Sequence, residues 1–205
     1  MNLFFNELIS STIQVIVLSI IPFLWWVITA RKKENFFQWV GIKKIETENR
    51  NKFLFFTGLC ILLFLIFGTY LLYMTKDIET ATSKFKGLKF AGLPSVLVFA
   101  FLGTALSEEI LFRGFLTKRL INKFGFKIGN LIQGILFGLI HIVLMLLANI
   151  SGIIELIVIG VFTGSIGWFM GYINEKMANG SILPGWIIHG LANIFSSIIS
   201  LFSLI

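Results

Sequence analysis

The sequence is poor in cysteine and in charge. Its one cysteine, Cys60, lies inside an apolar run, so the chain cannot form an internal disulfide or a cysteine-rich metal site. No activating residue neighbours Cys60 in sequence, so we do not predict a cysteine nucleophile. Only 13% of the 205 residues are charged and 57% are hydrophobic, whereas soluble domains average about 25% charged residues. We therefore predict that lipid surrounds most of this chain.

The net charge of +7 does not indicate nucleic-acid binding, because the Lys and Arg residues stand between apolar runs. In that position they are typical of topology signals and of contacts with anionic lipid. The first apolar run has no leading basic region and is followed by Arg31, Lys32 and Lys33. This pattern predicts a retained membrane span and not a cleaved signal peptide.

The apolar runs predict an all-α, multi-spanning transmembrane helical bundle with about six spans, since a span needs about 20 apolar residues. A proline at position 184 suits the start of the last span. We divide the chain into an N-terminal two-span region with a basic amphipathic loop, residues 1–92, and a catalytic membrane core of four spans, residues 93–205. The predicted spans are residues 8–30, 53–74, 93–117, 128–148, 153–172 and 184–204.

The distribution of basic residues predicts the orientation of the bundle. Twelve Lys and Arg residues fall in the connections 31–52, 118–127 and 173–183, against four in residues 75–90. The positive-inside rule places the first three connections in the cytoplasm and both termini outside. Residues 31–52 also contain several aromatic side chains, so we expect this connection to lie on the membrane surface.

Glycines at helical spacing predict where two spans pack closely. Small residues four apart allow helix backbones to approach within a membrane. The glycines concerned are Gly134 and Gly138 on the fourth span and Gly160, Gly164, Gly167 and Gly171 on the fifth.

Three ionisable residues interrupt the third span, where each costs roughly 2.5–3.5 kcal/mol to insert. Glu109 and Arg113 are four apart and can form an ion pair on one helix face. Glu108 is rotated by about 100° from Glu109 and is expected to point elsewhere, free for another task. A solvated helix end is the alternative, but Glu108 lies about 16 Å of helix before Arg119 and so within the bilayer.

The only two histidines of the chain both lie in predicted spans. His141 follows Phe137 by four residues, and Asn193 follows His189 by four, so each pair shares a helix face. Taken singly, these residues could be interhelical hydrogen-bonding groups. Together with the glutamates they are the parts that acid–base chemistry requires.

The motifs Glu-Glu-x-x-x-Arg, Phe-x-x-x-His and His-x-x-x-Asn follow one another on three separate spans. In this order they resemble the CPBP family of CAAX proteases and bacteriocin-processing proteins, also called the Abi family, which consists of intramembrane endopeptidases. The resemblance covers about residues 93–204, the catalytic core of that family.

The resemblance implies a role for each matching residue. Glu108 would be the general base that activates water, and His141 would share that water. His189 and Asn193 would stabilise the oxyanion of the tetrahedral intermediate. Supporting roles are implied for Glu109, Arg113 and Phe137.

No cofactor is favoured. A metal remains an alternative, because Glu108, His141 and His189 are residue types that bind Zn²⁺. The His-Glu-x-x-His helix of many zinc peptidases is absent from the sequence.

We therefore predict an intramembrane endopeptidase that acts on a membrane-associated peptide or protein, with lipid and that substrate as its partners and with no nucleic-acid partner. The alternative is a bacteriocin self-immunity or resistance protein that acts by binding. A small transporter is a third reading, although no paired repeat of interrupted helices is present. The Lys- and Ile-rich composition is associated with AT-rich bacterial genomes, so we expect an integral protein of a bacterial cell membrane.

Overall fold

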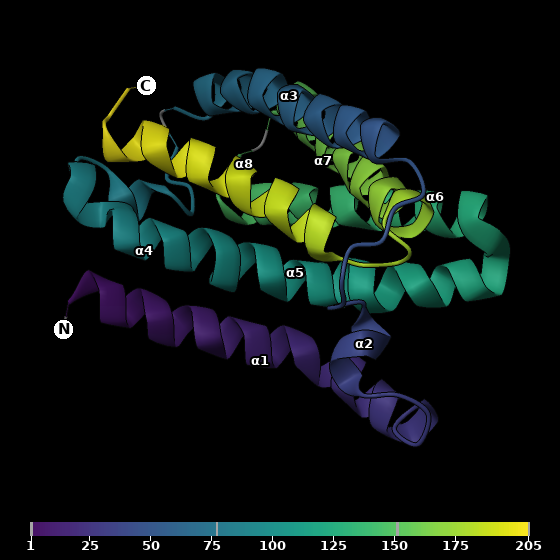
Figure 1. The fold of residues 1–205 in the computed structure, drawn as a ribbon. Coiled ribbons are helices and arrows are strands. Elements are labelled where there is room, and N and C mark those ends of the chain that lie inside the picture. The colour runs from purple at the N-terminus through teal and green to yellow at the C-terminus, as the bar shows by residue number, and fades with distance from the viewer. Residues whose placement is uncertain (1, 77, 151, 205) are drawn as a thin grey trace.

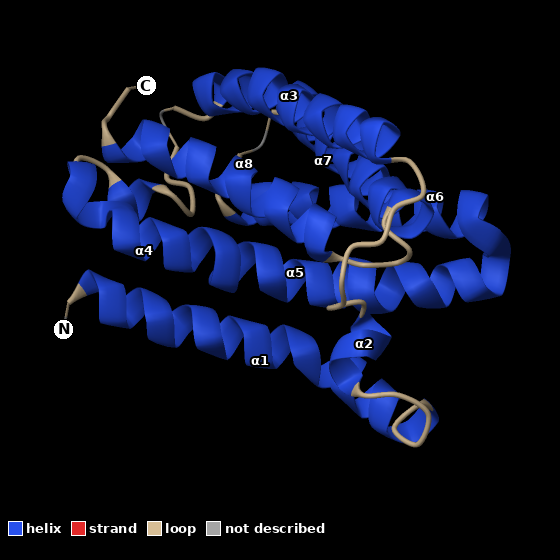
Figure 2. Ribbon diagram, viewed as in Figure 1, coloured by secondary structure: helices blue, strands red, loops and turns tan. Residues whose placement is uncertain are grey.

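The computed structural model describes residues 2–76, 78–150 and 152–204, and these residues contain helices and no strand (Figures 1 and 2). The predicted all-α fold is confirmed. Five helical segments are long and apolar enough to cross a membrane. They are Leu3–Thr29, Arg50–Met74, Lys89–Leu147, Ile153–Met177 and Leu183–Leu201.

The long helices carry the labels used below. They are α1 (Leu3–Thr29), α3 (Arg50–Met74), α6 (Lys118–Leu147), α7 (Ile153–Tyr172) and α8 (Leu183–Leu201). Short elements connect or extend them: α2 (Phe36–Val40), η1 (Ser83–Phe85), η2 (Lys89–Gly92), α4 (Leu93–Leu97), η3 (Val98–Leu106), α5 (Ser107–Glu109), η4 (Ile110–Thr117) and η5 (Ile173–Met177). The predicted proline start of the last span is confirmed, because Pro184 lies in the first turn of α8.

The third and fourth predicted spans form one 59-residue helical segment that folds back on itself at Gly125. Gly125 has φ +76° and ψ 166°, a conformation that is essentially restricted to glycine. The two arms pack side by side, since the rings of Phe112 and Phe137 are 5.0 Å apart. The five helical segments therefore supply the six predicted spans.

The predicted connection at residues 118–127 is helical on both sides of Gly125. The connection between the two spans is therefore the bend at Gly125, and the rest of the segment extends the two helices. The Lys and Arg residues make this segment polar, but they are good helix formers and do not interrupt the helix.

Two segments of the third span are wider than an α-helix. Both η3 and η4 are π-helical, and they flank the single α-helical turn α5. The Thr104 hydroxyl donates to the carbonyl of Phe99, and the Thr117 hydroxyl donates to that of Phe112, each five residues earlier. Such π-helical turns are frequent at functional sites, and here they surround Glu108 and Glu109.

The predicted glycine contact between α6 and α7 is confirmed. A Cβ atom added to Gly134 would lie 2.9 Å from the carbonyl oxygen of Gly164, and one added to Gly138 would clash with the carbonyl oxygen of Gly160. The backbones can therefore approach this closely only because neither helix carries a side chain at the crossing.

The connections gather at two ends of the bundle, as the predicted topology requires (Figure 1). At one end, Lys118 pairs with Glu175 at 2.7 Å and Asn179 donates to Glu46 at 2.9 Å. At the other end, Lys84 pairs with Glu7 at 2.8 Å and joins the loop before η2 to α1. Both termini lie at this second end. The basic connections thus share one end of the molecule.

The basic connection between α1 and α3 is only partly a surface segment. Its short helix α2 buries Trp39 and Val40, which pack with Ile110 and Ile182, whereas Phe37 is exposed. Part of the aromatic content that suggested a membrane-surface segment therefore belongs to the protein core.

Candidate functional site

A buried ion pair anchors the candidate site. Arg113 Nη1 lies 2.9 Å from Glu109 Oε1, and both side chains are fully buried. The predicted pairing of these residues is confirmed. Because an unpaired charge is costly to bury, the arginine compensates the charge of Glu109 at this depth in the bundle.

Two carboxylates face the imidazole ring of His189. Its Nδ1 lies 3.3 Å from Glu109 Oε1, and its Nε2 lies 3.9 Å from Glu108 Oε2. An ionised carboxylate only accepts, so the N–H at Nδ1 donates a hydrogen bond to Glu109. Glu108, on a different helix face from Glu109, thus reaches the other nitrogen of the same ring. Successive residues of α5 reach the same ring because it lies between their carboxylates.

The two glutamates nevertheless differ in exposure. The side chain of Glu109 is fully buried, whereas that of Glu108 is 16% exposed. The ion pair of Arg113 is with Glu109 and not with Glu108. The buried hydroxyl of Ser107, the residue before Glu108, donates to the carbonyl of Gly103. One carboxylate is thus held by a cation, and its neighbour is open to another group.

His141 is oriented by its own helix. Its Nδ1 lies 2.8 Å from the carbonyl oxygen of Phe137. A carbonyl oxygen only accepts, so Nδ1 donates and Nε2 carries the free lone pair. The ring also packs on that of Phe137, which in turn contacts the ring of His189. The structure thus brings the histidines of α6 and α8 to the same phenylalanine ring.

Phe137 is the centre around which these groups pack. Its ring centre lies 4.5 Å from that of His141, 6.2 Å from that of His189 and 4.1 Å from the guanidinium carbon of Arg113. Phe137 is only 2% exposed. It therefore packs against the arginine and both histidines at once, and it joins elements that are far apart in sequence.

Asn193 lies one turn after His189 on α8, as predicted. Its side-chain nitrogen is buried and has no hydrogen-bond partner among the residues that the structure describes. A buried amide donor without a partner is costly unless it has a ligand to bind. Asn193 therefore offers an available donor beside the ring of His189.

Residues 90–195 match the family described as type II CAAX prenyl endopeptidase, Rce1-like. The match covers more than half of the chain and includes all seven predicted site residues. The chain belongs to this family. No curated protein and no solved structure matches it.

Membership of the Rce1-like family agrees with the resemblance that the three motifs indicate, and it makes this chain an intramembrane endopeptidase of the CAAX type in general terms. Together with the apolar helices, it also makes the chain an integral membrane protein. The roles of individual side chains are taken up below as proposals.

The sequence reasoning missed three amides buried near the site of this Rce1-like chain. Asn130 donates to the carbonyl of Trp168 at 3.0 Å, and Gln133 donates to that of Gly167 at 2.9 Å. Asn130, Gln133 and Phe137 recur at helical spacing, a signal that could have indicated a common face with His141. The third, Asn174, gave no such signal, because its contacts are with α8.

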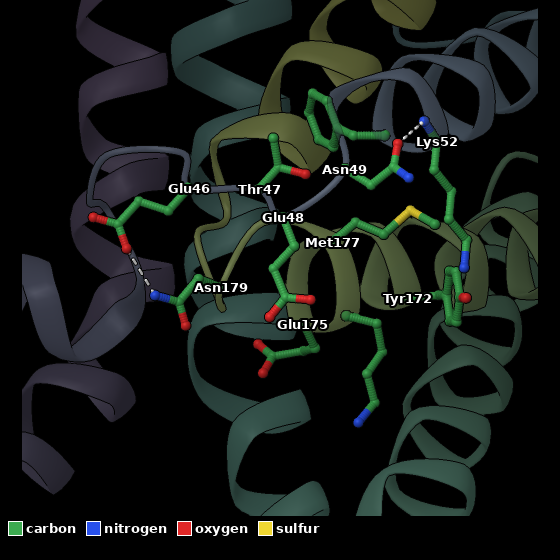
Figure 3. A pocket seen from close by; sticks show the side chains of 11 residues that line it. Glu46, Thr47, Glu48, Asn49, Lys52, Tyr172, Glu175, Met177 and Asn179 are labelled. Carbon is green, nitrogen blue, oxygen red and sulfur yellow. Dashed lines mark hydrogen bonds between the residues drawn. The ribbon is translucent and has the colours of Figure 1, made fainter.

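A cavity of about 650 Å³ lies at the basic end of the bundle, away from these side chains (Figure 3). Its walls come from the connection before α3, from the start of α3 and from the end of α7 with η5. It is lined by Glu46, Thr47, Glu48, Asn49, Lys52, Phe53, Tyr172, Glu175, Lys176, Met177 and Asn179. None of the predicted site residues of the Rce1-like domain lines it.

Within the described residues, no group of three or more His, Cys, Asp and Glu side chains is arranged to hold a metal ion. The alternative zinc ligands Glu108, His141 and His189 therefore do not form a recognisable metal site. Their chemistry as acid–base groups is considered next.

Proposed function

We propose that this protein hydrolyses a peptide bond of a membrane-associated peptide or protein with a water molecule that Glu108 activates. The observation that carries the proposal is the difference between two adjacent carboxylates. Glu109 is fully buried against Arg113, whereas Glu108 is partly exposed and lies 3.9 Å from His189. A carboxylate that is not neutralised by an arginine can accept the proton of a water molecule.

His141 is proposed to share this water. Because its Nδ1 donates to the carbonyl of Phe137, its Nε2 presents a lone pair. Such a nitrogen can orient the water by accepting a hydrogen bond from it, and the proton that Glu108 takes from the water is then available for the amine that leaves. Two proton acceptors on different helices would therefore hold the nucleophile between them.

His189 and Asn193 are proposed to stabilise the oxyanion. The amide nitrogen of Asn193 is a buried donor without a partner. His189 can donate from Nε2 when its ring carries two protons, and Glu109 stabilises the charge of that ring through Nδ1. Donors that are in position before the reaction stabilise the developing negative charge without reorganisation.

Glu109, Arg113 and Phe137 are proposed to support this arrangement. The ion pair holds an acceptor against His189 Nδ1, and the Phe137 ring packs on the guanidinium and on both imidazoles.

The experiment that tests the proposed base compares Glu108→Gln with the unchanged protein in membranes of the host cell. We expect Glu108→Gln to lose about 10²–10⁴-fold in cleavage rate, the usual contribution of a general base. Uncleaved membrane peptides or proteins should accumulate and can be identified by mass spectrometry. Glu155→Gln, which changes a carboxylate in the first turn of α7, is the matched control and should leave cleavage unchanged.

The proposal is abandoned if Glu108→Gln cleaves the identified substrate at the rate of the unchanged protein. The glutamic mechanism without a metal is tested separately. The purified protein should keep its activity in the presence of a strong chelator, and elemental analysis should find less than stoichiometric zinc. Loss of activity to the chelator, with recovery on adding Zn²⁺, would favour the metal mechanism.

A further inference from the structure

Asn174, in η5, attaches that segment to the first turn of α8. The side chain is fully buried, and its oxygen accepts a hydrogen bond from the backbone N–H of Gly185 at 2.9 Å. Helix α8 has no side-chain cap of its own at Ile182. Asn174 therefore satisfies one of the free N–H groups of the helix that carries His189.

The other end of the Asn174 amide lies beside Glu109. A Cβ atom added to Gly185 would lie 2.7 Å from Asn174 Nδ2 and 2.6 Å from Glu109 Oε2, so the donor and the acceptor lie against the same backbone position. Both atoms are buried, and neither has a hydrogen-bond partner among the described residues. Each atom is therefore a candidate partner for the other, because buried polar groups are nearly always paired.

The second oxygen of the same carboxylate is already engaged. Glu109 Oε1 lies 2.9 Å from Arg113 and 3.3 Å from His189 Nδ1. A carboxylate is planar, so a group that holds Oε2 also determines the direction of Oε1. Asn174 can thus control the contact between Glu109 and His189 without touching the histidine.

We propose that Asn174 is a positioning residue that holds the carboxylate of Glu109 over Gly185, so that the neutral ring of His189 keeps its proton on Nδ1. Nε2, on the side of Glu108, is then the nitrogen that takes the second proton when the ring acts as a donor to the oxyanion. The proposal deepens the proposed function, and the use of this arrangement in catalysis rests on that function. The role is specific to Asn174 within η5, because its neighbours Glu175 and Met177 line the cavity at the basic end of the bundle (Figure 3).

The chain has only two histidines, which allows a direct measurement. The protein is labelled with ¹⁵N in histidine, reconstituted in lipid nanodiscs, and its ring nitrogens are observed by NMR under alkaline conditions where both rings are neutral. The variant His141→Gln assigns the two rings. In the unchanged protein we expect the proton of His189 on Nδ1.

In Asn174→Ala, the ratio of the Nδ1–H to the Nε2–H form of His189 should fall by about three- to tenfold, the effect of one ordinary hydrogen bond. The form of His141 should not change. Gly185→Ala keeps both polar side chains but inserts a methyl group between them, and it should lower the ratio in the same way. It is the second test if Asn174→Ala does not fold.

Asn130→Ala is the matched control. It removes an equally buried amide that bonds to Trp168 and Gln133 between α6 and α7. Its His189 ratio should equal that of the unchanged protein. The proposal is overturned if neither Asn174→Ala nor Gly185→Ala changes the ratio, or if Asn130→Ala changes it equally. The NMR measurement needs no substrate. Cleavage by Glu108→Gln at the rate of the unchanged protein would therefore refute the proposed function without changing the result for Asn174.

Discussion

The two glutamates of the site are the same residue type but lie in different environments. Glu109 contacts Arg113 and His189 and has no exposed surface, whereas Glu108 keeps 16% of its side chain exposed. A buried charge that loses its partner is penalised much more than a partly exposed one. The same residue type can therefore stabilise the site in one position and be available for chemistry in the next.

Arg113→Met should destabilise the protein, because it leaves Glu109 buried without its cation. Breaking a buried ion pair on one side costs about 3–5 kcal/mol. Unfolding in mixed micelles with increasing SDS measures the loss. The double variant Glu109→Gln/Arg113→Met removes both charges and should recover part of it; a single variant as stable as the unchanged protein would contradict this account of the pair.

Asn193→Ala should lower kcat by about 10²–10³-fold, the usual effect of removing one oxyanion donor. Its thermal stability should change little, because the amide nitrogen has no partner among the described residues. The cleavage rate of the substrate identified with Glu108→Gln measures the effect. Ser197→Ala, which removes a buried and equally unpaired hydroxyl one turn later on α8, should retain full activity, and unchanged turnover in Asn193→Ala would exclude the oxyanion role.

At the scale of helices, the crossing of α6 and α7 determines where Phe137 and His141 lie. Gly138 stands between these two residues in sequence and faces the carbonyl of Gly160 across the crossing. Gly167, further along α7, lies against Phe137 and Arg113. The close approach of the two backbones therefore presses α7 against the centre of the site.

Gly138→Ala should separate α6 from α7, because the added methyl group would clash with the carbonyl of Gly160. We expect a loss of about 1–3 kcal/mol in stability, as for other overpacked positions, and a loss of activity as Phe137 moves. SDS unfolding and the cleavage assay measure the two effects. Gly58→Ala is the control: a Cβ atom there has nothing within 4 Å, and equal effects of both variants would show that the crossing is not responsible.

Contacts set by spacing within one helix could be predicted from the sequence. The pair Glu109–Arg113, the proline start of α8 and the glycine faces all follow from helical periodicity. The approach of Glu108 to His189 and the bond from Gly185 to Asn174 could not be predicted, because both depend on how α8 crosses α5 and η5. The π-helical turns could not be predicted either, because their residues have ordinary helical patterns.

The whole molecule is a bundle whose outside is apolar and whose polar side chains converge inside. Large apolar residues of α1, α3, α6 and α7 are exposed along their lengths, as expected where lipid is the solvent. The basic connections gather at one end, with the ion pair of Lys118 and Glu175 among them. The distribution of charge therefore distinguishes the two ends of the bundle, and with them the two sides of the membrane.

The positive-inside rule predicts that this basic end faces the cytoplasm. Cys60 is the only cysteine, so a Cys60→Ser background allows single cysteines to be introduced at exposed positions of either end. In intact cells, a membrane-impermeant maleimide should label Lys86→Cys and leave Lys44→Cys unlabelled until the cells are opened. The reverse pattern would invert the topology. With the basic end inside, Glu108 is separated from Arg119 by the whole π-helical segment η4, so a substrate bond must reach this depth from the cytoplasmic surface or enter from within the bilayer.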